Sequence, residues 1–170
     1  IPPISKRNKR QAEGTQVYGM SELDDFYDFL EEINKFCKIQ NIPASTASSE
    51  FAPGQFEINL NSTTDLLKAA DDSVLLRRLV KETAIKHGYE ATFLSKPYIN
   101  EAGSGMHLHI SLYDENKNNV FVKNKLKNKN LLHAIGGLQK TMYESMAIFA
   151  PNINSYRRFL PDQFVPVNSS

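Results

Sequence analysis

The sequence predicts an α+β fold with a largely antiparallel sheet flanked by helices. Segments with helical spacing of apolar residues are separated by short segments in which apolar and polar residues alternate. Three of these strand-like segments follow one another, and such runs of adjacent strands are typical of α+β folds rather than of doubly wound ones. No G-x-x-x-x-G-K-[ST] motif occurs, so a nucleotide would not be held by a P-loop.

Length, charge and cysteine content limit the class of protein to which this chain can belong. The 170 residues suit one domain, and 20 Lys and Arg against 19 Asp and Glu argue for no nucleic-acid or membrane partner. The single cysteine, Cys37, cannot form an intrachain disulfide, and no apolar run approaches the ~20 residues of a membrane span. We expect a cytoplasmic protein. The opening Ile-Pro-Pro and the closing Val-Asn-Ser-Ser suggest an excerpt, so residues 1–170 are expected to be part of a longer domain.

Three segments predict helices. The first covers 21–40, the second covers 64–87 with Gly88 as its C′ residue, and the third covers 130–149 and is ended by Pro151. The apolar residues of the first helix recur at helical spacing: Leu23, Phe26, Leu30, Ile33 and Cys37.

Strands are predicted at 56–60, 89–97, 106–112 and 120–122. In 56–60 the apolar residues alternate with Glu57 and Asn59, which indicates a half-buried strand with one polar face. Segment 89–97 is rich in aromatic and β-favouring residues and ends at a proline.

The segment 106–112 carries an unusual polar row. Because side chains alternate across a strand, His107, His109 and Ser111 would share the face opposite the apolar residues. One imidazole could bind a metal while the next reaches another group, and the preceding glycines 103 and 105 would let the loop approach a substrate closely. A structural role for two histidines on a wet sheet face remains an equal alternative.

Glu50 and Glu57 form a second candidate cluster. An extended chain would separate them by about 23 Å. Pro53 and Gly54, however, have the chemistry of a turn that could bring both carboxylates to one side of a cleft, where Mg²⁺ or Mn²⁺ prefers such oxygens. A surface hairpin with two unrelated glutamates is the alternative.

Two adjacent arginines, Arg157 and Arg158, follow the third helix. In an extended segment they would point to different faces, so one could bind a carboxylate or phosphate. A structural salt bridge is an equally good interpretation.

These motifs, in this order, resemble the catalytic domain of the glutamine synthetase family. The similarity extends from about Tyr18 to Val167 and includes "EFAPGQFEINL", "GSGMHLHISL" and "APNINSYRRFLP". The resemblance implies an ATP-dependent ligase that phosphorylates the γ-carboxylate of glutamate and lets an amine displace the phosphate. Divalent ions and arginines would stabilise the accumulating negative charge.

The resemblance also implies roles for single residues. Glu50 and Glu57 correspond to ligands of one Mg²⁺ (or Mn²⁺), and His107 corresponds to a ligand of the second ion, which bridges the ATP phosphates. His109 and Ser111 correspond to nucleotide contacts.

The glutamate and amine sites would use other positions. Gly103 would contact glutamate through its backbone, and Arg158 matches the catalytic arginine that engages glutamate. Tyr18 matches, less closely, a tyrosine of the amine pocket.

Two departures indicate the acceptor. Ammonia-using members of the family have Asn-Gly-Ser-Gly, and this chain has Ala102 in place of the Asn. Those members also have a glutamate that helps to deprotonate ammonium, and this chain has Phe164 at that position. The amino-acid sequences of the motifs are also similar to those of the γ-glutamylpolyamine (γ-glutamylputrescine) synthetase branch. We therefore expect an organic amine or polyamine as acceptor; the alternatives are an ammonia-using glutamine synthetase and a catalytically silent family member.

The resemblance further implies a homo-oligomeric ring for the full-length protein and metal and phosphate ligands outside residues 1–170. The 170-residue chain alone is therefore expected to be inactive. A metal protein of the cupin type is a rival, but Glu115 lies six positions after His109 and the expected glycine is replaced by Val122, so the cupin spacing fails.

Overall fold

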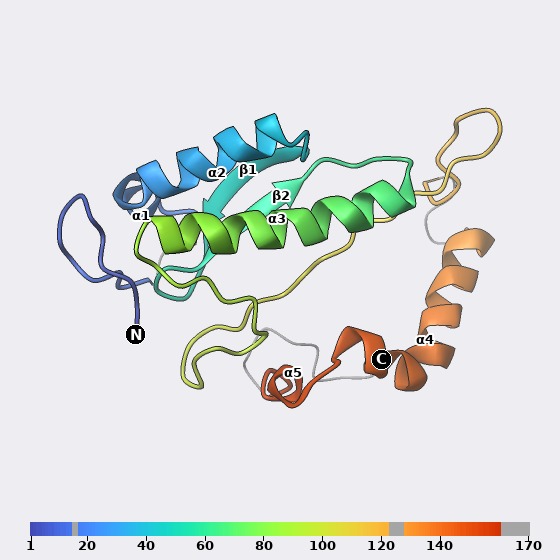
Figure 1. Cartoon of the computed structure of the whole chain (residues 1–170). Helices are drawn as coiled ribbons and strands as arrows, with labels where there is room; N and C mark the ends of the chain where they lie inside the picture. Colours follow the sequence, from blue (N-terminus) through green and yellow to red (C-terminus); the bar gives the residue numbers. More distant parts are fainter. Residues whose placement is uncertain (15–16, 123–127, 161–170) are drawn as a thin grey trace. The chain divides into compact units, whose positions relative to one another are not determined.

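The computed structural model describes residues 1–14, 17–122 and 128–160, and these ranges divide into two compact units, of which the first is Ile1–Gly103 and the second begins at Ser104. The first unit contains α1 (Met20–Asp25), α2 (Tyr27–Ile39), β1 (Ala44–Ser49), β2 (Phe56–Leu60) and α3 (Leu66–Lys86). The second contains α4 (Lys129–Phe149) and α5 (Ile153–Tyr156). The α+β class is confirmed, and the described sheet is a two-stranded antiparallel hairpin (Figure 1).

The core of the first unit lies where α2, α3 and one face of the hairpin meet. Its buried members come from both helices and the segment before β1: Ile33, Cys37, Ile42, Leu76 and Leu79. Ile58 and Leu60 of β2 pack against this cluster, so the alternate residues Glu57 and Asn59 face away from it. The hairpin thus has one apolar face against helices and one polar face.

The predicted helix over 21–40 is interrupted at Phe26. This residue has φ −112° and ψ 18°, and it separates α1 from α2. Its ring is buried and lies 5.5 Å from that of Phe56 and 5.6 Å from that of Tyr89, measured between centroids. Helical spacing in the sequence does not reveal this break, because the break depends on aromatic partners far along the chain.

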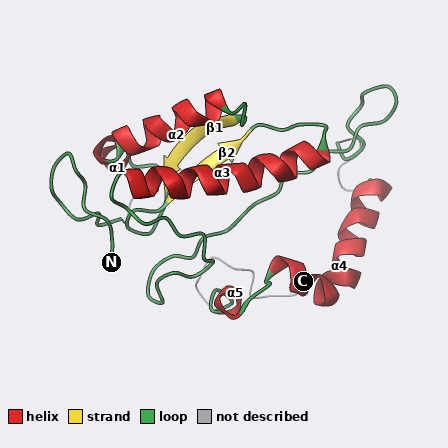
Figure 2. Cartoon of the chain, viewed as in Figure 1, coloured by secondary structure: helices red, strands yellow, loops and turns green. Residues whose placement is uncertain are grey.

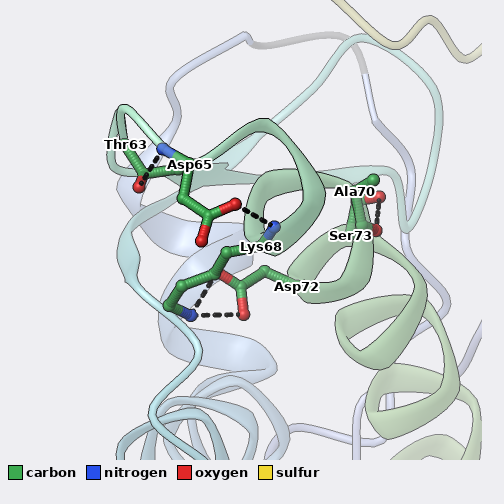
Figure 3. A network of polar contacts seen from close by, with 6 residues as sticks. All are labelled: Thr63, Asp65, Lys68, Ala70, Asp72 and Ser73. Carbon is green, nitrogen blue, oxygen red and sulfur yellow. Dashed lines mark hydrogen bonds and ion pairs between the residues drawn. The ribbon is translucent and has the colours of Figure 1, made fainter.

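The ends of α3 follow from local sequence. The Asp65 carboxylate caps the helix by accepting the Lys68 N–H at 3.0 Å, and the Lys68 ammonium pairs with Asp72 one turn later (Figure 3). At the other end Gly88 has φ +72°, its N–H donates to Ile85, and the Tyr89 N–H donates to Ala84. This is a Schellman motif, and it confirms the predicted C′ glycine.

One predicted helix of the second unit is confirmed, and predicted strands in both units are corrected. α4 ends at Phe149, just before Pro151, as predicted. The predicted strands at 89–97, 106–112 and 120–122 are wrong: each stretch is loop or turn (Figure 2), with one isolated bridge between Tyr113 and Asn119. A strand needs a hydrogen-bonded neighbour, and the described residues provide no ladder partner for these segments.

No helix within the described ranges is both long enough and apolar enough to cross a membrane.

Candidate functional site

The turn between the two candidate metal-binding glutamates forms as predicted. The Gln55 N–H donates to the Ala52 carbonyl at 3.0 Å, with Pro53 and Gly54 at the two central positions. Gly54 has φ +69°, which is the left-handed conformation that the second central position of a type II turn requires. A side chain at this position would also collide with the ring of Pro3.

The strand register brings Glu50 and Glu57 to one face of the hairpin. Ser49 pairs with Phe56 and Ser48 with Glu57, and the Glu50 N–H extends the pairing by donating to the Gln55 carbonyl at 2.8 Å. Opposed residues of an antiparallel pair share a face, so Glu50 and Glu57 are diagonal neighbours on the polar face. The hairpin replaces the long extended separation by a distance of about 7 Å between their Cβ atoms.

Tyr18 lies beside this pair through backbone contacts. Its N–H donates to the Ser49 carbonyl at 2.9 Å, and the buried Ser49 hydroxyl donates to the Gly19 carbonyl at 2.9 Å. Tyr18 has φ +60°, which is costly for a bulky residue, and its side chain is 73% exposed. The structure therefore holds the Tyr18 backbone next to Glu50 and leaves its ring accessible.

Gly103 is connected to the same hairpin. The Gln55 side chain donates from Nε2 to the Gly103 carbonyl at 3.2 Å, while its Oε1 accepts the Ala52 N–H at 3.0 Å. The buried Lys96 ammonium donates to the Glu101 carbonyl two residues before Gly103. Four candidates named from the sequence, Tyr18, Glu50, Glu57 and Gly103, are thus linked within the first unit.

In the second unit Arg158 contacts the glycine loop. Its Nη1 donates to the Ser104 carbonyl at 2.8 Å, and a Cβ at Gly105 would lie only 2.7 Å from that nitrogen. Arg157 is the C-cap of α5 and has the αR conformation, so the two arginines follow a helical turn and the condition of an extended segment is not met. Arg157 is exposed and Arg158 half-buried, with its Nε buried and without a hydrogen-bond partner among the described residues.

His107, His109 and Ser111 occupy a fully exposed stretch. Every residue from Gly105 to Leu112 is exposed, including the apolar Met106 and Leu108. The polar row therefore exists in the sequence, whereas the strand that would order it does not form among the described residues. Phe164 lies outside the described residues.

Within those residues, the structure gathers no three His, Cys, Asp or Glu side chains able to hold a metal ion. Glu50 and Glu57 provide two carboxylates on one face of the hairpin. Mg²⁺ uses one or two protein carboxylates and completes its shell with water and phosphate oxygens, so two carboxylates on one face suit it.

The comparisons with known proteins agree with these motifs. The model of the glutamine synthetase catalytic domain matches residues 1–170. The chain belongs to the glutamine synthetase family.

Two curated relatives of this glutamine synthetase family chain carry names of amine ligases. The γ-glutamylputrescine synthetase PuuA of Escherichia coli is 43% identical over 170 residues, which are 99% of this chain and 36% of the relative. The glutamate–isopropylamine ligase of a Pseudomonas species is 37% identical over 158 residues, which are 90% of this chain and 34% of the relative.

A solved structure agrees on the fold of this family chain. The GmaS/ADP complex matches with a TM-score of 0.78 and 29% identity, and the match covers 95% of this chain and 38% of that one. The chain therefore spans about a third of the length of the relatives it matches.

Sequence reasoning missed three residues that hold this glutamine synthetase-type hairpin: Gln55, Ser49 and Glu22. The Glu22 carboxylate accepts the Gly54 N–H at 2.9 Å. Burial raises the pKa of the Glu22 carboxyl above its ordinary value; the bond from Gly54 opposes this rise, and the charge of Asp25 adds to it. Gln55 alternates with Glu57 on the polar face, and this alternation is a signal that could have identified it.

Proposed function

We propose that the full-length protein is an ATP-dependent ligase that joins the γ-carboxylate of glutamate to an organic amine through a γ-glutamyl phosphate. The main observation in support of this proposal is the hairpin of this glutamine synthetase family chain. It presents Glu50 and Glu57 on one face and binds Gly103 through the Gln55 side chain. Residues 1–170 are proposed to form part of its catalytic domain.

Glu50 and Glu57 are proposed to bind one divalent ion. Both lie on the polar face of the hairpin, opposite the core, and carboxylate oxygens are ligands that a hydrated divalent cation prefers. Mg²⁺, or Mn²⁺ in its place, supplies positive charge that lowers the repulsion between the glutamate carboxylate and the ATP phosphates. The hairpin residues keep the two oxygen donors on one face.

His107 is proposed to bind the second ion, and His109 and Ser111 are proposed to contact the nucleotide. An imidazole nitrogen and a hydroxyl at alternate positions are suited to metal and phosphate or ribose oxygens. Their exposure leaves them accessible to a ligand.

Arg158 is proposed as the catalytic residue that engages glutamate. Guanidinium has five donors, of which Nη1 is used on Ser104 and Nε has no partner among the described residues. A carboxylate or the developing negative charge of the acyl transfer can accept the remaining N–H groups. The γ-carboxylate oxygen attacks the terminal phosphorus of ATP and releases ADP, and the amine nitrogen then displaces phosphate and loses a proton.

The choice of an organic amine rests on sequence positions and on the names of relatives. Phe164 replaces an acidic residue of ammonia-using members, which removes an ammonium-binding charge and offers an apolar surface to an alkyl chain. Tyr18, with its exposed ring, is proposed as an amine-binding residue. The two relatives described above are named for putrescine and isopropylamine.

The direct test is an assay of the full-length protein with glutamate, ATP and either ammonium or putrescine. We expect formation of a γ-glutamyl amide with at least one alkyl amine or polyamine at a higher kcat/KM than with ammonium. Turnover of ammonium well above every amine tried would replace this proposal by that of a glutamine synthetase. Absence of glutamate-dependent ADP formation would indicate a silent family member.

Assembly and location are proposed by the same analogy. We propose a homo-oligomeric ring in the cytoplasm, to be measured by light scattering of the full-length protein and by cell fractionation. A monomer that is fully active would contradict the ring.

A further inference from the structure

Gln55 has no catalytic or ligand-binding role in the proposed function, yet its side chain bonds to backbone groups of the turn and of Gly103. It is opposite Glu50 in the hairpin and two residues before Glu57 on the same face. Its Oε1 accepts the Ala52 N–H at 3.0 Å and its Nε2 donates to the Gly103 carbonyl at 3.2 Å.

We infer that Gln55 is a positioning residue that couples the metal-binding turn to the glutamate-binding backbone of Gly103. The inference rests on the proposed function and deepens it. Gln55 would act through Gly103 on glutamate, without touching the reacting atoms itself.

A side-chain amide satisfies both contacts without a change of protonation. The Ala52 N–H needs an acceptor and the Gly103 carbonyl needs a donor, and a primary amide carries both on one rigid plane. Reversing the amide would place NH₂ against an N–H and oxygen against a carbonyl, so the two partners also determine its orientation. A glutamate of the same shape keeps the acceptor and loses the donor, and a methionine loses both.

The loop that carries Gly103 needs such an anchor. Glycine has the largest conformational freedom of any residue, so a Gly103 carbonyl without a partner would sample many orientations. Lys96, which is 1% exposed, fixes the Glu101 carbonyl, and Gln55 fixes the carbonyl two residues later. The two side chains together determine the direction of the backbone at Gly103.

The turn and Gly103 are coupled because the residue that binds the Gly103 carbonyl, Gln55, is part of the turn. Gln55 belongs to the type II turn itself, since its N–H donates to the Ala52 carbonyl and its carbonyl accepts the Glu50 N–H. A movement of the turn would therefore move the anchor of Gly103. Binding of a divalent ion at Glu50 and Glu57 should thus favour the Gly103 conformation that binds glutamate.

The test compares Gln55→Glu with Gln55→Met in the full-length protein, with Gln40→Glu as the matched control. Gln40 is exposed at the end of α2, at the opposite end of the hairpin from the turn. For Gln55→Glu we expect the KM for glutamate to rise about three- to tenfold, with kcat changed less than about twofold and the melting temperature kept. Gln55→Met should raise the same KM and also lower the melting temperature, because the turn loses its acceptor.

Amide hydrogen exchange of the peptide spanning 96–104 provides a readout that needs no turnover. We expect faster exchange in Gln55→Glu than in the parent protein and in Gln40→Glu. The Mg²⁺ requirement is measured in parallel, since Gln55→Glu adds charge between Glu50 and Glu57.

The outcomes separate this inference from the proposed function. A parent protein that shows no glutamate-dependent ADP formation overturns the function, and the exchange measurement then decides whether Gln55 holds the loop. Normal glutamate turnover with an unchanged KM and unchanged exchange in Gln55→Glu overturns the inference and limits Gln55 to forming the turn.

Discussion

The two units differ in how far their apolar patterns are buried. Ile33 on α2 and Ile135 on α4 both belong to helical apolar stripes, yet Ile33 is 2% exposed and Ile135 is 44% exposed. In the first unit α2, α3 and the hairpin bury one another's apolar faces, whereas α4 has no buried residue. An amphipathic pattern therefore predicts which face of a helix can be buried. That face is buried only where a neighbouring element packs against it.

The candidate site residues follow the same division. Glu50, Glu57, Tyr18 and Gly103 are held by strand pairing or hydrogen bonds within the first unit, while His107 and His109 lie in an exposed stretch that forms no strand ladder. Polar side chains on a buried scaffold are preorganised, and those on an exposed segment depend on what they bind.

Two alanine variants of the 170-residue chain test whether the apolar residues of α2 are packed more firmly than those of α4. Ile33→Ala should lower the free energy of unfolding by about 2–5 kcal/mol, because it opens a cavity in the core. Ile135→Ala should change it by less than about 0.5 kcal/mol. Urea unfolding followed by circular dichroism measures both. Equal losses would mean that α4 is packed as firmly as α2.

The metal proposal for the hairpin is tested by Glu57→Gln in the full-length protein. Loss of a carboxylate ligand should lower kcat at fixed Mg²⁺ by about 100-fold and raise the Mg²⁺ requirement. Glu90→Gln is the control, since Glu90 is exposed in the same unit and lies outside the hairpin. Activity of Glu57→Gln equal to that of the control would remove Glu57 from the metal site.

The contact of Arg158 with the glycine loop is tested by Gly105→Ala. The new Cβ would lie 2.7 Å from Nη1 of Arg158 and would displace the guanidinium. We expect the KM of the full-length protein for glutamate to rise about tenfold.

Gly136→Ala on α4 provides the matched glycine variant, because a Cβ there meets nothing within 4 Å. Alanine should stabilise the helix of the 170-residue chain by about 0.5–1 kcal/mol, measured by thermal unfolding. Destabilisation instead would show that another surface approaches α4 closely.

The smallest effect is expected from the surface pair between α2 and α3. Lys86 first, and His87 second, donate to Glu32 and hold its pKa below the ordinary value of 4.5. A lowered carboxyl pKa stabilises the fold above the unfolded pKa, and this contribution is lost as the pH falls through the folded pKa. Glu32→Gln should therefore be slightly less stable than the parent above pH 4.5, and the difference should disappear as the pH falls through the lowered folded pKa of Glu32. A stability difference that persists unchanged in acid would contradict the pair.

Local sequence was sufficient for several elements of the first unit. The Pro53–Gly54 turn, the strand 56–60 and the Gly88 helix end depend on conformational preferences of a few adjacent residues, and all three are confirmed. The break at Phe26 was missed because it depends on Phe56 and Tyr89, which are distant in sequence. The strands predicted at 89–97 and 106–112 failed because alternation specifies a face but supplies no hydrogen-bonding partner.

By itself the sequence determined the family, the C-terminal ends of α3 and α4 and the chemical types of the candidate residues, since these depend on residue identity and short-range spacing. The tertiary structure alone decided that Glu50 and Glu57 share a face, that Tyr18 joins them through Ser49, and that Gln55 binds Gly103. These contacts join residues up to 48 positions apart. They arise only when the buried core brings separate segments together, because a hydrogen bond requires both partners within about 3.5 Å.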